Sequence, residues 1–206
     1  NIIGKKINKN INPVFLFSSV VPKVFMNIKK NFKSTKFKIL EIKNLKLNKI
    51  LKINIKNKKK LGSDRIANAI GAKKLKNCLI IDFGTATTFD VIKNGIYEGG
   101  VIAPGVNLSI KNLSQATALL PLIKLKTHQK NYGKNTIEAL KAGFVGGYEG
   151  LLNNIIDKII SRSKIKYKIL LTGGYANFFN KLIKKKVVID QDITIKGIAN
   201  AYKELI

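Results

Sequence analysis

The stretch IDFGTATT, residues 81–88, carries the residue types best suited to chemistry on a phosphate. An apolar run delivers the carboxylate of Asp82 at the end of an expected strand, Gly84 allows a tight turn, and three threonines supply hydroxyls. Carboxylate, hydroxyl and turn N–H groups can together hold phosphate oxygens and a metal ion. A plain strand that runs into a polar hairpin turn satisfies the same spacing, so both interpretations stay open.

A second candidate is GSDR at residues 62–65, which opens an expected helix. Asp64 could accept a proton from a substrate hydroxyl, provided that it comes within hydrogen-bond distance of that group. The guanidinium of Arg65 could bind a substrate anion. The alternative is a helix cap, formed by Ser63 or Asp64, with its counter-charge beside it.

Two weaker candidates follow further along the chain. The expected strand at 166–174 ends in Thr172, Gly173 and Gly174, where a flat ring could lie against bare backbone, although many α/β strands end in this way. Thr136 opens the longest helical pattern, either as a simple N-cap or as a hydroxyl offered to a ligand at the positive helix end. The single histidine, His128, stands in a polar loop, and we expect it at the surface.

The elements that must position these residues alternate between strands and helices, which indicates an α/β fold. The dipeptide Asn94-Gly95 between two apolar runs predicts a tight hairpin. A restart of the strand pattern near residue 77 suggests a domain boundary there. Strands are expected at 13–22, within 37–55, and at 78–83, 88–93, 96–103, 166–174 and 187–190; helices are expected at 24–33, 63–71, 106–119, 134–160 with interruptions near Gly143, Gly146 and Gly147, 175–185 and 193–206.

Composition limits the class of protein. The 206 residues suit one large domain or two small ones. No apolar run approaches the roughly 20 residues of a membrane span, and the single Cys78 fits a reducing cytoplasm. The net charge of +28 could indicate nucleic-acid binding, but nearly all of it is lysine mixed with Ile and Asn, as AT-rich coding DNA produces. Only 11 residues are acidic, and Asp64, Asp82 and Asp90 fall close together.

Taken in order, these motifs resemble the type III pantothenate kinases of the acetate and sugar kinase/Hsp70/actin superfamily. The series is SSVVP, GSDR, IDFGTATTFD, GGVIAPG, LP, GKNT, TGG and ITIKGI, and it extends from about residue 14 to the end. The resemblance implies two ribonuclease-H-like (actin-like ATPase) domains. Residues 1–77 would be the remainder of the first domain, without its N-terminal strands, and residues 78–206 the second.

The resemblance also implies ATP-dependent phosphorylation of pantothenate to 4′-phosphopantothenate, the first step of coenzyme A biosynthesis, by a cytoplasmic homodimer whose pantothenate pocket lies near the interface. The implied cofactors are a monovalent cation, K⁺ or NH₄⁺, and Mg²⁺ with ATP; neither a specific nucleic acid nor a membrane is an expected partner. The implied residues are Asp64 as the catalytic base; Gly62, Ser63, Asp64, Arg65 and Thr136 for pantothenate; Gly84, Thr85, Thr172, Gly173 and Gly174 for ATP; and Asp82 for the cation.

Two departures from the family pattern stand out. Nothing before Ser18 matches the family's DxGNT phosphate-binding hairpin, so we expect an N-terminally truncated chain that binds ATP poorly and exposes a sheet edge. Ile55 also stands where the family often has a tyrosine that contacts pantothenate. The alternatives are a basic nucleic-acid-associated or regulatory protein on a kinase-like scaffold, an inactive fragment, and a related kinase for a sugar or acetate.

Overall fold

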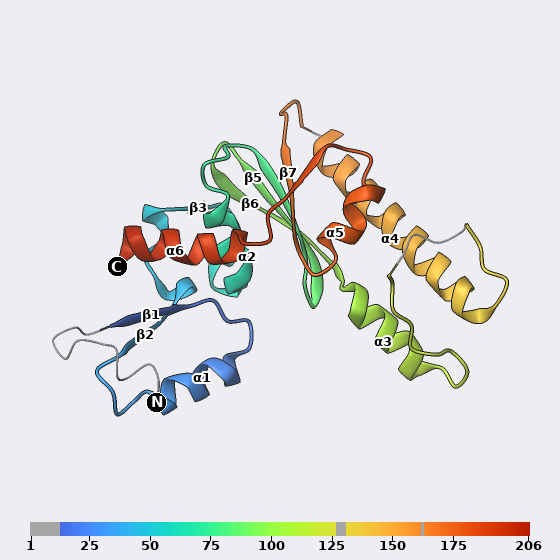
Figure 1. Ribbon diagram of the computed structural model, residues 1–206. Coiled ribbons are helices and arrows are strands. Elements are labelled where there is room, and N and C mark those ends of the chain that lie inside the picture. Colours follow the sequence, from blue (N-terminus) through green and yellow to red (C-terminus); the bar gives the residue numbers. More distant parts are fainter. Residues whose placement is uncertain (1–12, 127–130, 162) are drawn as a thin grey trace.

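A six-stranded mixed sheet forms the centre of the computed structural model, which describes residues 13–126, 131–161 and 163–206 (Figure 1). The strand order is β3-β6-β5-β4-β7-β8. Strands β4, β5 and β6 form an antiparallel meander, while β7 and β8 continue parallel to β4 on its other side. This order is ribonuclease-H-like, as the sequence predicts. The strands are β3 (Lys52–Ile53), β4 (Cys78–Phe83), β5 (Ala86–Lys93), β6 (Ile96–Pro104), β7 (Lys168–Gly173) and β8 (Val187–Ile189).

The hairpin between β5 and β6 turns as its sequence predicts. Asn94 and Gly95 have φ angles of 52° and 76°. Positive φ at both central residues matches the right-handed twist of the flanking strands. The register between the two strands shifts between Val91 and Ile92 of β5, because β6 carries one extra residue, Glu98, between Tyr97 and Gly99.

The N-terminal segment forms a separate, two-stranded parallel sheet. Strand β1 (Val14–Phe17) pairs with β2 (Lys38–Glu41), and helix α1 (Pro22–Asn31) connects them. Within the described residues β1 has one strand neighbour. Short 3₁₀ turns, η1 (Ile42–Asn44), η2 (Leu47–Lys49) and η3 (Lys58–Lys60), lead to β3 and then to helix α2 (Ser63–Gly71). The domain boundary at residue 77 falls between α2 and β4, and it stays a prediction.

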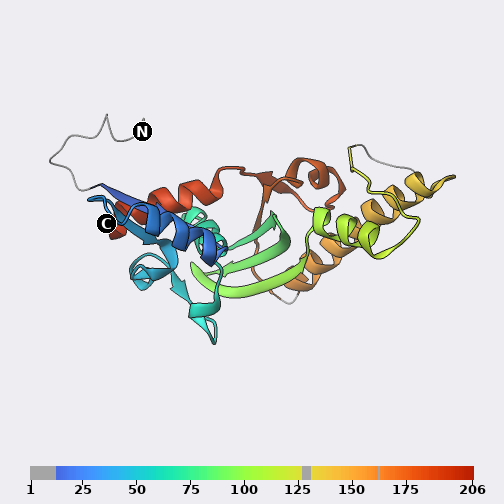
Figure 2. The ribbon, with the colours of Figure 1, turned by 90° about the horizontal axis from the view of Figure 1, so that it is seen from below.

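Helices α3 (Val106–Ala116) and α4 (Thr136–Ser161) extend away from the sheet as an arm (Figures 1 and 2). The predicted interruption of α4 near its glycines is wrong, because the helix is continuous over 26 residues. A glycine within a helix costs only about 1 kcal/mol relative to alanine. Burial of Val145, Leu152 and Ile156 in the core offsets that cost.

Period-two alternation along β4 assigns its side chains to two cores. Leu79, Ile81 and Phe83 pack on the α4 side of the sheet, together with α5 (Ala176–Phe179) and the 3₁₀ turn η4 (Asn180–Leu182). Cys78 and Ile80 pack on the opposite side, against α2 and α6 (Ile193–Leu205). Alternation therefore places Asp82 on the same side of the sheet as α2. None of the described helices has the length and apolar character needed to cross a bilayer.

Helices α2 and α6 approach each other through glycines. A Cβ on Gly197 would lie 1.8 Å from the carbonyl oxygen of Ala67, and one on Gly71 would lie 2.2 Å from that of Ile193. An ion pair joins Lys73, which lies just after the end of α2, to Glu204 near the end of α6. Backbone-to-backbone contact of this kind leaves no space for a side chain.

We expect Gly197→Ala to destabilise the fold by about 2–3 kcal/mol, because the new methyl group meets rigid backbone and forces the helices apart. Urea unfolding measures this loss. The matched control is Gly174→Ala, where an added Cβ meets nothing within 4 Å, and there the change should stay within about 0.5 kcal/mol. Equal stability of the two variants would contradict the close-packing argument.

Candidate functional site

The carboxyl ends of the parallel strands β4 and β7 bring two expected site residues together. Asp82 of β4 lies opposite Thr172 of β7, and Phe83 lies opposite Gly173. In open α/β sheets, ligands bind just beyond the carboxyl ends of the strands. This edge of the sheet is therefore the first candidate for a ligand site.

Glycines expose the main chain at this edge of the sheet. Gly174 donates its N–H to the carbonyl of Phe83 at 3.1 Å, and Gly84 donates to Ala86 at 3.1 Å. Gly173 has φ +84°, and a Cβ there would lie 2.7 Å from Asp82 Oδ1. Gly84 and Thr85 are exposed at the β4–β5 turn. A ligand can therefore approach the main chain closely at this turn.

Helix α2 presents Asp64 in its first turn, and Gly62 is the N-cap. A Cβ on Gly62 would lie 2.5 Å from Asp64 Oδ1, so the glycine leaves room for the carboxylate. Asp64 Oδ1 accepts the N–H of Arg65 at 2.8 Å. Ser63 turns inward, where its hydroxyl donates to Glu41 at 2.7 Å. The predicted cap through Ser63 or Asp64 is thus wrong, since no side chain caps this helix.

One turn further along α2, Asn68 connects the helix to β4. Its Nδ2 donates to Asp82 Oδ2 at 2.8 Å, and its Oδ1 accepts the hydroxyl of Thr194 at 2.6 Å. Burial raises the pKa of Asp82, the hydrogen bond from Asn68 lowers it, and the negative charge of Asp64 raises it further. The carboxylates of Asp64 and Asp82 are thus close enough to repel each other, and both are only partly buried.

A second connection runs from α2 to β5. Arg65 Nε donates to Asp90 Oδ1 at 2.7 Å, and the hydroxyl of Tyr97 donates to the same oxygen at 2.7 Å. Burial raises the pKa of Asp90 to about 6, against the opposing effects of Arg65 and Tyr97 and with a further increase from Asp64. The guanidinium therefore pairs with a distant strand and not with the neighbouring Asp64.

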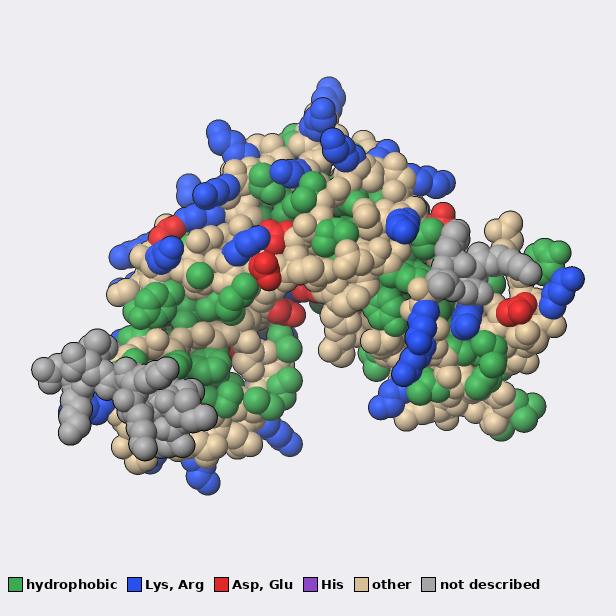
Figure 3. Space-filling view, viewed as in Figure 1, with side chains coloured by type: hydrophobic (Ala, Val, Ile, Leu, Met, Phe, Trp, Pro, Cys, Tyr) green, Lys and Arg blue, Asp and Glu red, His purple; other side chains and the backbone are tan. Residues whose placement is uncertain are grey.

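Figure 3 shows acidic side chains gathered near the centre of this face, above the hollow that separates the two lobes of the molecule. The structure brings together most of the expected site residues around the ends of β4 and β7 and the start of α2. These are Gly62, Asp64, Arg65, Asp82, Gly84, Thr85, Thr172, Gly173 and Gly174.

Thr136 is not brought to this region, because it opens α4 at the far end of the arm (Figures 1 and 2). It is also not the N-cap that its position suggested. Asn135 Oδ1 accepts the N–H of Glu138 at 2.9 Å and so caps the helix. The hydroxyl of Thr136 is left at an exposed position. His128 lies outside the described residues.

Sequence reasoning did not assign a role to four polar residues that hold the site together. Asp90 stood out only as one of few acids, and Asn68 lies four residues after Asp64, on the same face of a helix. Tyr97 and Thr194 carry no local signal, because each meets its partner only after the sheet and the α2–α6 pair have formed.

The surroundings of Asp82 fit a cation that takes few protein ligands. Its Oδ2 accepts the hydrogen bond from Asn68. Its Oδ1 lies beside two glycines without side chains: a Cβ on Gly173 would lie 2.7 Å from this oxygen, and a Cβ on Gly84 would lie 3.8 Å from it. Carboxylate and carbonyl oxygens suit hard cations. In the described part of the chain no group of three or more His, Cys, Asp and Glu residues could hold a metal ion.

Comparison with known proteins relates this chain to one family. The family model for the type III pantothenate kinases matches residues 4–158. The type III pantothenate kinase of Pelagibacter ubique is 50% identical over 94% of this chain and 78% of its own length, and that of Sulfurihydrogenibium sp. is 39% identical over 92% and 76%.

A solved structure from Campylobacter jejuni, described as a conserved Baf family transcriptional activator, aligns with a TM-score of 0.66. It covers 99% of this chain and 88% of its own, at 23% identity. At that identity the likeness shows the fold.

The raised pKa of Asp90 predicts a pH-dependent stability. An acid whose pKa is raised by folding binds its proton more tightly in the folded chain. Its protonation therefore stabilises the fold fully below the unfolded pKa, about 4 for Asp. This contribution is lost as the pH rises through the folded pKa, which is about 6 for Asp90. Between these pH values, the free energy of unfolding of the wild type should fall relative to that of Asp90→Asn. Urea unfolding at a series of pH values measures both, and a constant difference would contradict the assignment.

Proposed function

The chain belongs to the type III pantothenate kinase family, and from this premise we propose how its residues transfer the γ-phosphoryl group of ATP to the 4′-hydroxyl of pantothenate. The products are 4′-phosphopantothenate and ADP, and the reaction is the first step of coenzyme A biosynthesis. The observation that carries the assignment is the convergence of Asp64 on α2 and Asp82 on β4 at one edge of the sheet.

Asp64 is the general base. Among the described residues, Asp82 and Asp90 each accept side-chain hydrogen bonds, whereas Asp64 accepts one from a backbone N–H. Its other oxygen is thus available for the substrate hydroxyl. As that hydroxyl oxygen attacks the γ-phosphorus and the bond to the ADP oxygen breaks, the proton passes to the carboxylate of Asp64.

The turn after β4 and the end of β7 bind ATP. Thr85 and Gly84 lie exposed at the first, and Thr172, Gly173 and Gly174 form the second. The N–H groups of Gly84 and Gly174 are already bound within the chain, so the exposed hydroxyl of Thr85 is the group that suits a phosphate oxygen. The bare glycines suit a flat adenine ring. Asp82 would hold the monovalent cation, K⁺ or NH₄⁺, which together with the Mg²⁺ of ATP would supply positive charge against the phosphates.

Pantothenate binds along the start of α2. Gly62 and Ser63 contribute backbone there, because the Ser63 hydroxyl is already bound to Glu41. Arg65 binds the anionic end of the substrate. The reaction takes place in the cytoplasm, where ATP is supplied and where the single Cys78 stays reduced.

The enzyme acts as a homodimer in which Thr136 of one copy serves the other. Within one chain α4 begins far from α2 (Figure 1), so a contact between Thr136 and the same substrate as Asp64 requires a second subunit. Apolar residues on the arm support pairing, because Leu108, Leu113 and Ile137 are 42%, 37% and 48% exposed. Burying such surface is the usual driving force for association.

Asp64→Asn should lower kcat by about 10³-fold, the range expected for loss of a general base, with an unchanged fold. Phosphopantothenate formation by the full-length protein, with ATP, Mg²⁺ and a potassium titration, measures this. The control is Asp157→Asn, which removes an acid that is 57% exposed and pairs with Lys185 at the surface. Activity like that of the wild type in Asp64→Asn would remove Asp64 as the base.

Mixing two impaired variants tests the shared site. At a pantothenate concentration well below its raised KM, Thr136→Ala should have little activity, and Asp64→Asn should lower kcat by about 10³-fold. Unfolding and refolding equal amounts together makes half of the dimers mixed, and one of the two sites in each mixed dimer is intact, so about a quarter of wild-type activity should return under two-fold symmetry. Each variant refolded alone is the control. No recovery in dimers shown to be mixed would place both residues in one subunit's site, and normal activity of Thr136→Ala alone would place Thr136 outside it.

A further inference from the structure

Arg65 is enclosed by three elements that fix its guanidinium. Nε is bound to Asp90 on β5, the central carbon lies 6.0 Å from the ring centre of Tyr97 on β6, and Nη2 lies against Gly100, where a Cβ would come within 2.6 Å of it. The Arg65 side chain is 12% exposed. Only a small part of it can therefore meet a ligand, and the part that does is set by these neighbours.

The partner side of this contact is fully buried. Asp90 and Tyr97 are both 0% exposed, and burial raises the pKa of Tyr97, so its hydroxyl stays protonated and donates. Both donors bind Oδ1. Asp90 Oδ2 and Arg65 Nη2 find no partner among the described residues. The carboxylate is thus held by two hydrogen bonds to a single oxygen, and Tyr97 supplies one of them.

This arrangement is a costly way to stabilise a fold. Removing two charges from water usually costs more than their attraction returns, and apolar residues of similar volume often serve stability as well or better. The residue at this place is also one of only two arginines among 39 basic side chains. The planar, forked guanidinium differs from a lysine by its fixed directions of hydrogen bonding, which suit a carboxylate.

We propose that Asp90 and Tyr97 are positioning residues for substrate binding: together they hold Arg65 in one orientation, in which the N–H groups of the guanidinium that are not buried bind the carboxylate of pantothenate. This inference rests on the proposed function. Gly100 also contributes to this position of Arg65, because any side chain at residue 100 would displace the guanidinium. Neither Asp90 nor Tyr97 touches the reacting atoms.

Tyr97→Phe is the mildest test, since it removes one hydroxyl and keeps both charges. We expect the KM for pantothenate to rise about tenfold, the effect of one lost hydrogen bond to a charged group, while kcat and the KM for ATP stay within about twofold. The matched control is Tyr148→Phe, which removes another hydrogen-bonded hydroxyl, held by Ser109 and Pro104. It should leave the KM for pantothenate unchanged.

A double-mutant cycle separates positioning from simple structural support. Asp90→Asn and Arg65→Lys should each raise the KM for pantothenate, and the double variant should resemble Arg65→Lys alone, because Asp90 acts through Arg65. The inference would be overturned if the double variant is active and its increase in KM equals the product of the two single increases. A KM within twofold of the wild type in both Tyr97→Phe and Asp90→Asn would also overturn it. A wild type without pantothenate kinase activity would instead overturn the proposed function.

Discussion

Helix α2 is held on the sheet by two side-chain bridges, and every candidate catalytic group depends on them for its position. Arg65 binds Asp90 on β5, and Asn68, one turn later, binds Asp82 on β4. Because the bridges reach adjacent strands from successive turns, they limit both the rotation of the helix and its height above the sheet. Asp64 gains a defined place through its neighbours, while its own carboxylate stays available for chemistry.

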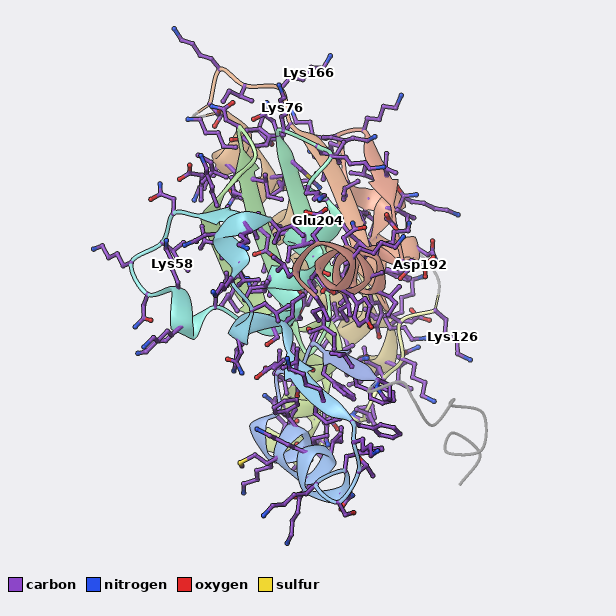
Figure 4. All side chains as sticks on the ribbon, turned by 90° about the vertical axis from the view of Figure 1, so that its left-hand side faces the viewer. Lys58, Lys76, Lys126, Lys166, Asp192 and Glu204 are labelled. Carbon is purple, nitrogen blue, oxygen red and sulfur yellow. The ribbon has the colours of Figure 1, made fainter. Side chains whose placement is uncertain are left out.

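The same bridges concentrate negative charge in a strongly basic chain. Burial raises the pKa of Asp82 and of Asp90, and the charge of Asp64 adds to both shifts. Lys58, Lys76 and Lys166 are exposed and extend from different parts of the surface (Figure 4). A positive periphery attracts anionic substrates at long range, and salt screens this attraction beyond about 8 Å. The acids thus gather at the centre of a molecule whose net charge is positive.

Local signals carried most of the prediction. The helix at 63–71, the strand at 78–83 and the Asn94-Gly95 turn follow from neighbouring residues alone, and the structure has all three. The prediction of a break in α4 was wrong, because burial of apolar side chains in the core outweighed the low helix propensity of glycine. The bridges between α2 and the sheet could not be predicted from the sequence, since Arg65 and Asp90 are 25 residues apart. Whether Arg65 pairs with Asp90 or with the neighbouring Asp64 depends on how the helix lies across the sheet.

The hydrogen bond between Thr194 and Asn68 spans 126 residues and joins α6 to the helix that carries Asp64. With the glycine contact between the same helices, it makes α6 a structural support for α2. A nascent chain on the ribosome can complete its α2–α6 contact only after α6 has left the exit tunnel. Until then the apolar face of α2 lacks its cover, so the support of α2 is completed only late in synthesis.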